Sequence, residues 1–337
     1  MIDYLLLLMV IFLPLIIPVV IVVLKMGGQG SISSRINQAL VLHASKGLSE
    51  QGLLWLSIAV PFTYALMFGF ISWQGHTILL TGEGLSNFLK ISAFPIAFIS
   101  LSLPLAVLVS RLHATKQTAE QIRLTRVKNN VDLFQSHRKE LFSYFAQIGD
   151  VNYLDCFVGQ YRVHPRVHKI YFVGNQESGT PALNLSSFQE VEDDLNSVRF
   201  FLDMVIRNIN PALTFDAYLC NFCSRMYRVS AKLGLPEIYE GMAGKSVLVP
   251  VKKIGDGPSS LITVGTTTKD AIASFRYAYN FFKNLSDFAG YVESKSVDPE
   301  MRYIDEGDKY LEKSEFLVIE KIHKYDIPEM QVRLMDD

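Results

Sequence analysis

Residues 4–24 read YLLLLMVIFLPLIIPVVIVVL, an apolar stretch without a charged side chain. Two further charge-free stretches follow at residues 53–73 and 91–109. An α-helix needs about 20 residues to cross the hydrocarbon core of a bilayer, and each stretch has about that length. The sequence therefore predicts three transmembrane helices, at 4–24, 53–73 and 91–109, within a membrane region of residues 1–110.

A secretory signal peptide is the alternative for the first stretch. It requires a basic leader and a small-residue cleavage site. The chain opens Met1-Ile2-Asp3 without Lys or Arg, and no Ala-x-Ala site follows Leu24. We therefore expect the first stretch to be retained as a span.

Basic residues beside the spans predict their orientation. The segment after the third stretch contains five of them against Glu120: Arg111, Lys116, Arg123, Arg126 and Lys128. The loop after the first stretch contains Lys25, Arg35 and Lys46 against Glu50, whereas the loop before the third contains only Lys90 and Glu83. Basic residues concentrate on the cytoplasmic side. We expect the amino terminus outside, residues 25–52 inside and the carboxy terminus in the cytoplasm.

The segment that follows the third stretch, residues 111–148, predicts an amphipathic juxtamembrane helix. It contains no Pro or Gly, and apolar residues recur at helical spacing: Val127, Val131, Phe134, Leu141, Phe145 and Ile148. Because nothing interrupts the pattern after Val109, we expect one helix from Ile91 to Ile148. A kink at Asn129-Asn130, both weak helix formers, is the alternative.

Residues 149–337 match one cytoplasmic domain of mixed α and β structure, mainly helical. A capping box at Ser187 and Glu190 predicts a helix to Asn208, and a second amphipathic helix ends at Gly234. A third helix is expected to begin after Thr267 or Thr268. Strands are expected at 169–173, 246–254 and 261–264, with the last two forming a hairpin through residues 255–258.

The charge of the chain is unevenly distributed. Residues 1–148 contain 11 Lys/Arg and 6 Asp/Glu, whereas the tail from Tyr291 contains 7 Lys/Arg and 13 Asp/Glu. Residues 149–337 as a whole contain 21 Lys/Arg and 27 Asp/Glu. The membrane-proximal part, residues 1–148, is therefore attracted to anionic lipid, whereas residues 149–337 do not favour general nucleic-acid binding. The acidic tail is either a solvated helical face or an inhibitory or partner-binding arm that meets the basic juxtamembrane helix.

The predicted spans contain five prolines, which are Pro14, Pro18, Pro61, Pro95 and Pro104. Each removes a backbone hydrogen bond and can bend its helix. Small residues share a face in the second and third spans, which favours close packing within one bundle or in a homo-oligomer. We single out Pro95 and Pro104 as bending points, and Arg123, Arg126 and Lys128 as charged contacts for lipid or the tail. No charged side chain lies inside a span, which argues against proton relays and voltage sensors.

No catalytic motif is present, and we expect neither enzymatic activity nor a cofactor. Gly244-Lys245-Ser246 resembles the end of a phosphate-binding loop, but Tyr239 stands where the first glycine is required. Cys220 and Cys223 have zinc-ligand spacing, and His164 and His168 are further candidates; a helical pattern around the cysteines favours free thiols. The acidic run 192–194 should fan around its helix instead of converging.

The juxtamembrane segment resembles a known group of bacterial proteins. The residues that carry the resemblance are Thr115-Lys116-Gln117-Thr118-Ala119-Glu120-Gln121-Ile122, then Thr125, Asn129, Asn130, Asp132, Phe134 and His137-Arg138-Lys139-Glu140-Leu141-Phe142. This pattern after a span is similar to that of the inner-membrane effectors encoded beside reverse transcriptases in retron anti-phage systems. The resemblance implies a toxin inhibited by a reverse transcriptase and its RNA-linked DNA and released during infection. Members usually have two spans, so the stretch 4–24 is a departure.

The leading hypothesis is therefore a non-enzymatic effector of the bacterial inner membrane, which disrupts or depolarises that membrane when it is released. Its expected partners are the lipid bilayer, a retron reverse transcriptase with its RNA-linked DNA, and further copies of the same chain. The alternatives are a membrane-anchored sensor or binding module whose spans only tether it, and an enzyme whose site is formed by dispersed residues.

Overall fold

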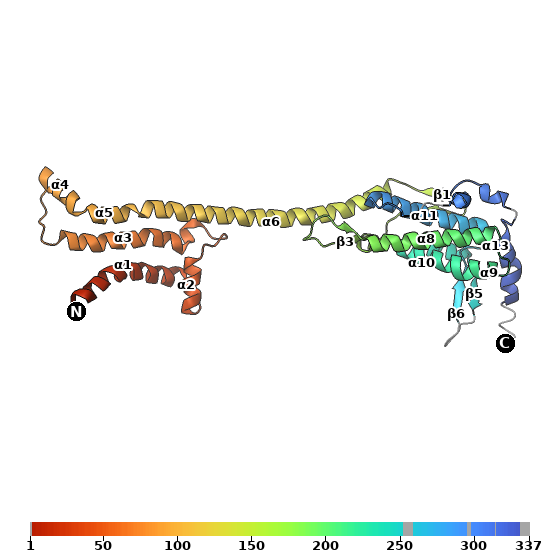
Figure 1. Cartoon of the computed structure of the whole chain (residues 1–337), viewed down its shortest axis with the longest axis horizontal. Coiled ribbons are helices and arrows are strands. Elements are labelled where there is room, and N and C mark those ends of the chain that lie inside the picture. Colours follow the sequence, from red (N-terminus) through yellow and green to blue (C-terminus); the bar gives the residue numbers. More distant parts are fainter. Residues whose placement is uncertain (1, 252–258, 295–297, 314, 331–337) are drawn as a thin grey trace. The chain divides into compact units, whose positions relative to one another are not determined.

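The computed structural model describes residues 2–251, 259–294, 298–313 and 315–330 (Figure 1). The chain is mostly helical, at 71%. It divides into two compact units, residues 1–128 and 129–337. The division falls inside one long helix, α6 (Ser102–Ala146), whose residues therefore belong to both units.

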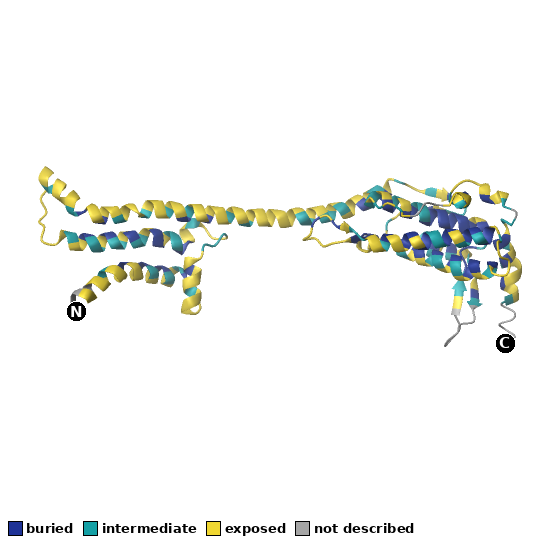
Figure 2. Ribbon diagram, viewed as in Figure 1, coloured by how far each residue is buried: buried dark blue, intermediate teal, exposed yellow. Residues whose placement is uncertain are grey.

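The first unit is built from apolar helices. Its helices are α1 (Ile2–Met26), α2 (Ile32–Leu40), the 3-10 turn η1 (Leu48–Glu50), α3 (Gly52–Trp73), α4 (Gly82–Ile91), α5 (Ala93–Ser100) and the first part of α6. Within it, α3 packs against both α1 and α5 (Figure 1). Three segments are long and apolar enough to cross a membrane: 7–26, 52–73 and the helical run that begins at Ala93. Most of their side chains are exposed (Figure 2), which is the pattern expected where lipid is the solvent.

The third apolar segment is not one unbroken helix. The structure ends α4 at Ile91, begins α5 at Ala93 and separates α5 from α6 at Leu101. The expectation of a single helix from Ile91 to Ile148 was therefore wrong at both points. At the first interruption, the backbone of Ser92 has φ −92° and ψ 0°. Pro95 and Pro104 each lie in the first turn of the helix that follows an interruption, α5 and α6, where the missing N–H of proline costs no helical hydrogen bond. Beyond Leu101 the helix α6 runs without interruption past Asn129-Asn130 to Ala146.

A side chain of α3 replaces a bond that a proline removes from α1. Pro18 has no N–H, so the carbonyl of Pro14 lacks its helical donor. The hydroxyl of Thr63 donates to that carbonyl oxygen over 2.6 Å. One turn away, the hydroxyl of Tyr64 donates to the carbonyl of Ile11, also over 2.6 Å. Two adjacent residues of α3 therefore fasten it to the proline-containing part of α1.

Aromatic rings join α3 to α5. Phe68 of α3 packs against Phe94 and Phe98 with ring centroids 4.8 and 5.0 Å apart. Tyr64 also stacks on Phe98, at 5.5 Å. At the carboxyl end of α3, the indole N–H of Trp73 donates to the Ser92 hydroxyl over 2.9 Å. This bond joins the residue between α4 and α5 to the end of α3.

The second unit is an α-helical domain with small hairpins. Its longer helices are α8 (Leu185–Ile206), α10 (Ser224–Leu233) and α11 (Thr268–Ala289), and its shorter ones are α7 (Arg166–Tyr171), α9 (Thr214–Asp216), α12 (Arg302–Asp305) and α13 (Val318–Lys321). Short 3-10 or π-helical turns lie at Ala217–Cys223, Glu237–Met242, Ala243–Lys245, Pro299–Met301, Lys309–Glu312 and Ile322–Asp326. The core contains fully buried aromatic and aliphatic side chains of α8, α10 and α11 (Figure 2), and Leu141 and Phe145 of α6 join it.

The strands form three separate antiparallel pairs. They are β1 (Val151–Tyr153) with β2 (Phe157–Gly159), β3 (Phe172–Val173) with β4 (Ala182–Leu183), and β5 (Leu248–Val251) with β6 (Ser259–Ile262). The hairpin expected near residues 246–264 is confirmed as a pairing of Leu248 with Ile262, and its connection at 252–258 lies outside the described residues. The strand expected at 169–173 was wrong for 169–171, which close α7, because Val167 and Tyr171 lie one turn apart on its buried face.

Helix ends confirm some sequence signals and correct others. Thr267 caps α11, and Asp270 accepts from the backbone of Thr267, which completes a capping box. Gly234 ends α10 at φ +70°, a conformation that favours glycine. At α8, however, the capping box predicted at Ser187 was wrong. The helix begins two residues earlier, at Leu185 after Asn184, because Asn184 bonds backward to the carbonyl of Ile170.

The bond between Thr63 and Pro14 leads to a first prediction. Thr63→Val keeps the shape of the side chain and removes the donor for the Pro14 carbonyl. We expect the free energy of unfolding of the apolar unit to fall by about 1 kcal/mol, the size typical of such bonds between apolar helices. Thermal unfolding of the purified chain in detergent measures it. Thr77→Val, in the exposed connection after α3, serves as the control and should change nothing; equal effects from both variants would contradict the assignment.

Candidate functional site: a polar loop beside α6

The loop between α2 and α3, residues 41–51, is held closed by one buried side chain. Gln51 is 1% exposed. Its amide nitrogen donates to the carbonyls of His43 at 2.9 Å and of Lys46 and Gly47 at 3.3 Å, and its amide oxygen accepts from the His43 N–H at 3.0 Å. A single glutamine therefore bonds to four backbone groups of this loop, whose only regular element within the described residues is the short turn η1.

Two side chains of α6 bind the same loop from outside. The ammonium of Lys116 donates to the carbonyl of Leu42 over 2.6 Å, and the amide of Gln117 to the carbonyl of Ala44 over 3.4 Å. One turn earlier, His113 is 3% exposed, and neither ring nitrogen has a hydrogen-bond partner among the residues the structure describes. The loop is thus in direct contact with the part of α6 that follows its apolar residues, so movement of that turn acts on the loop.

Close packing at Gly52 places the loop at the start of α3. A Cβ at this position would lie 2.3 Å from the carbonyl oxygen of Ala39 and 2.9 Å from Val22. Only glycine therefore allows α1, α2 and α3 to meet here. The small cluster of Val22, Ala39 and Leu56 seals the contact.

The residues singled out from the sequence do not gather at this loop. Pro95 is buried in α5, and Pro104 lies at the start of α6. Arg123 pairs with Glu120 of its own helix at 2.8 Å, and both side chains are largely exposed. Such an exposed pair contributes little to stability. Arg126 and Lys128 are exposed on the next turns of α6.

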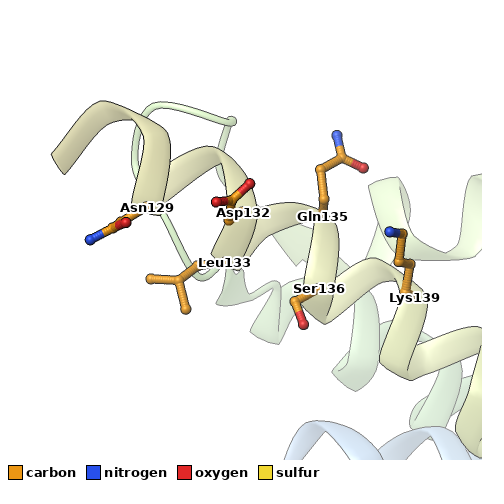
Figure 3. Close-up of a pocket in the computed structure, with 6 residues that line it drawn as sticks. All are labelled: Asn129, Asp132, Leu133, Gln135, Ser136 and Lys139. Atoms are coloured by element: carbon orange, nitrogen blue, oxygen red, sulfur yellow. The ribbon is translucent and has the colours of Figure 1, made fainter. Parts of the chain in front are cut away.

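In the second unit, α6 has a shallow hollow on one side (Figure 3). Its volume is about 570 Å³, and the residues that line it are Asn129, Asp132, Leu133, Gln135, Ser136 and Lys139. All six come from α6. The hollow has an exposed polar lining with one leucine, and it offers no set of converging groups for catalysis.

A pair of histidines fastens α6 to α7 within the second unit. Nδ1 of His137 and Nε2 of His168 are 3.1 Å apart, so one ring donates to the other. Phe172 and Phe288 pack edge to face against His137, with centroids at 4.6 and 5.3 Å. Burial lowers the pKa of His168 to about 4, with the charges of His137 and Arg138 as further causes. Burial also lowers the pKa of His137, and Glu140 opposes that shift. Both rings are therefore neutral near pH 7.

The start of the acidic tail is bound to α8 by a buried carboxylate. Glu192 is 3% exposed and accepts from the hydroxyl of Tyr291 at 2.5 Å. It also accepts from the N–H and the hydroxyl of Ser294, both at 2.8 Å. Asp193 and Asp194 point elsewhere on the helix, and Asp194 accepts from the ammonium of Lys232 at 2.9 Å. The run 192–194 therefore fans around α8 as the sequence predicted.

Two arginines hold the next part of the tail. Arg199 pairs with Asp305 at 3.0 Å, and its guanidinium lies over the ring of Tyr279 at 4.7 Å. Arg276 donates to the carbonyls of Ile304 and Gly307, both at 2.7 Å. The described part of the tail is thus packed onto its own domain through the buried Arg199 and Arg276, while acidic side chains such as Asp298, Glu300 and Glu312 remain exposed.

The metal and phosphate motifs are not assembled. Cys223 is buried in the core while Cys220 is exposed, and His168 faces His137 instead of His164. Within the described ranges, no three His, Cys, Asp or Glu side chains gather as a metal ion would require. Lys245 donates to the carbonyl of Cys156 at 2.9 Å, and its segment leads into β5 instead of a helix.

Comparison of the chain with protein-family models, with curated proteins and with solved structures finds no match. The site is therefore interpreted from its own geometry. Sequence reasoning missed Gln51, Gln117 and the partner of His137. A polar residue directly before an apolar helix was the available signal for Gln51, whereas the other two contacts join segments more than 30 residues apart.

The network of Gln51 leads to a second prediction. Gln51→Ala leaves the carbonyls of residues 43, 46 and 47 without their shared donor. We expect amide hydrogen exchange of residues 42–47 to speed up about tenfold, because a lost network of this kind costs 1–2 kcal/mol of local opening, as an order-of-magnitude estimate. Gln38→Ala, an exposed residue of α2, is the matched control. Unchanged exchange in the Gln51 variant would contradict the role assigned to it.

The histidine pair leads to a third prediction. Between pH 6.5 and about 4, an unfolded His168 takes up a proton that the folded ring does not, so the α6–α7 packing is fully stable above pH 6.5 and weakens as the pH falls through this window. Hydrogen exchange in α7, corrected for the intrinsic pH dependence, should therefore rise toward pH 4. His168→Gln should flatten that rise, while His164→Gln, at an exposed position, should keep it. The same pH slope in all three proteins would refute this explanation.

Proposed function

We propose that the chain is a non-enzymatic effector of the bacterial inner membrane in anti-phage defence. In this proposal, a reverse transcriptase with its RNA-linked DNA holds the domain of residues 149–337 inactive on the cytoplasmic side. Release during infection shifts α6, reorganises the apolar helices and depolarises the membrane. The amino terminus lies outside, and the chain crosses the membrane three times.

The observation that carries the proposal is the course of α6. This helix begins with apolar residues of the third membrane-length segment, binds the polar loop through Lys116 and Gln117, and ends with Leu141 and Phe145 in the core of the second unit. A helix without a break between these points transmits displacement, because its backbone hydrogen bonds resist bending.

The apolar helices themselves support a role beyond anchoring. Simple anchors need no prolines, yet α1 and α3 contain Pro14, Pro18 and Pro61, and α5 and α6 each begin with one. Prolines in such helices leave carbonyls that neighbouring side chains must satisfy. Thr63 provides such a bond, and rearrangement of the helices exchanges one set of partners for another.

The alternative of a membrane-anchored sensor or binding module is favoured by one observation. The second unit has an extended core of its own, formed largely by α8, α10 and α11. A domain of this kind can bind a partner without help from the apolar helices.

Expression of the chain in bacteria without its neighbouring genes tests the proposal. We expect growth arrest and loss of membrane potential, followed with a potential-sensitive dye. Residues 110–337 expressed alone, which lack all three spans, should leave growth and potential unchanged. Unchanged growth and potential with the full chain would refute the effector. Toxicity of residues 110–337 alone would refute the membrane mechanism and favour a dispersed enzyme site or a partner-binding toxin.

A further inference from the structure

The connection between α3 and α4, residues 74–81, exposes an apolar stretch. Ile78 and Leu80 are 92% and 97% exposed, and Leu79 between them is 60% exposed. His76 is the one residue of this connection with an ionisable side chain. Adjacent large apolar side chains are unfavourable in water, and a patch of this kind indicates an interaction surface.

Helix α4 extends this apolar surface. Leu85, Phe88 and Leu89 share one face of the helix and are each about half exposed. The polar side chains lie on the opposite face: Glu83, Ser86, Asn87 and Lys90. The helix has 10 residues, about half the length that crosses a bilayer. A short amphipathic helix with an uncovered apolar face is typical of one that lies in the plane of a membrane surface.

The connection is folded against the first turn of α4. The hydroxyl of Thr81 caps this helix by accepting from the N–H of Gly84 over 3.1 Å. A Cβ at Gly84 would overlap the carbonyl oxygen of Leu79, so glycine permits the close approach. A hollow of about 980 Å³ remains, and most of the residues that line it are apolar, among them Trp73, Ile78, Leu80, Leu85 and Phe88.

The backbone of the connection limits how deep it can lie in a membrane. The N–H groups of residues 77–80 have no hydrogen-bond partner among the residues the structure describes. Irregular backbone of this kind does not occur where hydrocarbon surrounds it, whereas the headgroup layer supplies water and polar acceptors. The side chains disfavour water and the backbone disfavours hydrocarbon, so the boundary between the two layers satisfies both.

The neighbouring helices bring the segment to that boundary. Helix α3, which ends at Trp73, and the helical run from Ala93 are both long and apolar enough to cross a membrane. The segment between them therefore begins and ends at one membrane face. The ring of Trp73 stacks on Phe88 of α4, with centroids 6.0 Å apart. Tryptophan residues concentrate at the level of the lipid headgroups, so this contact places α4 at the same level.

We propose that residues 78–91 lie in the interfacial layer of the membrane, with lipid acyl chains against the apolar face of α4 and in the hollow beside it. The apolar surface continues that of the membrane-length helices, and it requires no particular headgroup. The proposal rests on the membrane crossing of α3 and of the run from Ala93, which is part of the proposed function. It does not require the chain to be toxic.

A fluorescent label at single cysteines of the full chain tests the proposal in phosphatidylcholine vesicles. Cys220→Ser first removes the exposed native thiol. Burial raises the pKa of Cys156 to about 11 and that of Cys223 to about 12, so both thiols stay largely unreactive near pH 7. The Cys220→Ser chain without an added cysteine measures any remaining background label.

Labels at Leu80→Cys and Leu85→Cys should lose about half of their fluorescence to lipids with a nitroxide near the top of the acyl chain, and little to iodide in the water. Glu83→Cys, on the polar face of the same helix, is the matched control and should show the reverse. Leu66→Cys, at an exposed position of α3, should be quenched by a nitroxide deep in the acyl chain. Because the Leu80 side chain is almost fully exposed, its replacement removes no packing.

Three results would overturn the proposal. Iodide quenching at Leu80 and Leu85 with deep lipid quenching at Leu66 would make the segment a loop in water while the span remains. A label at Leu80 shielded from both quenchers would place protein, such as a second copy of the chain, on this surface. No lipid quenching at any position would refute the membrane crossing as well. None of these results measures toxicity, so the interfacial segment and the effector role fail separately.

Discussion

The arrangement of the first unit depends on one constraint, the need of every backbone polar group in an apolar helix for a partner. Water is not available to such groups in hydrocarbon, so a proline inside a helix leaves a carbonyl that another group can satisfy. The hydroxyl of Thr63 does so for the Pro14 carbonyl. At α5 and α6 the prolines lie in first turns, where the missing N–H costs no helical bond. The contact between α1 and α3 therefore includes this bond, whereas α3 and α5 meet through aromatic rings.

The same requirement organises the polar parts of the chain. Gln51 closes the loop between α2 and α3 by bonding to three carbonyls, and Arg276 binds the tail through carbonyls of residues 303, 304 and 307. In both places a buried side chain bonds to backbone carbonyls, of a loop in the first case and of the short helix α12 and the residue Gly307 in the second. These bonds are directional, so the segments they hold have one preferred arrangement. The described tail residues near 303–307 are therefore packed onto the domain.

Short sequence motifs predicted those helix ends that depend on contacts between residues close together in the chain. The start of α11 after Thr267 and the glycine end of α10 depend on residues within one turn, and the structure confirms both. Ser187 and Glu190 have the spacing of a capping box, but Asn184 starts α8 earlier because it bonds to Ile170 of another element. The strand expected at 169–171 failed for a similar reason. Val167 and Tyr171 are buried on one face of α7, which alternation of apolar residues could not reveal.

By itself, the sequence determined that three segments are suited to lipid, because length and the absence of charge need no knowledge of neighbours. It also favoured an uninterrupted helix over residues 105–146, because no Pro or Gly occurs there, but it did not predict the interruption at Leu101. Only the tertiary structure decided which side chains meet: Lys116 with the 41–51 loop, His137 with His168, and Glu192 with Tyr291. Each of these contacts joins residues at least 31 positions apart, and such pairing depends on packing of the whole unit instead of on local pattern.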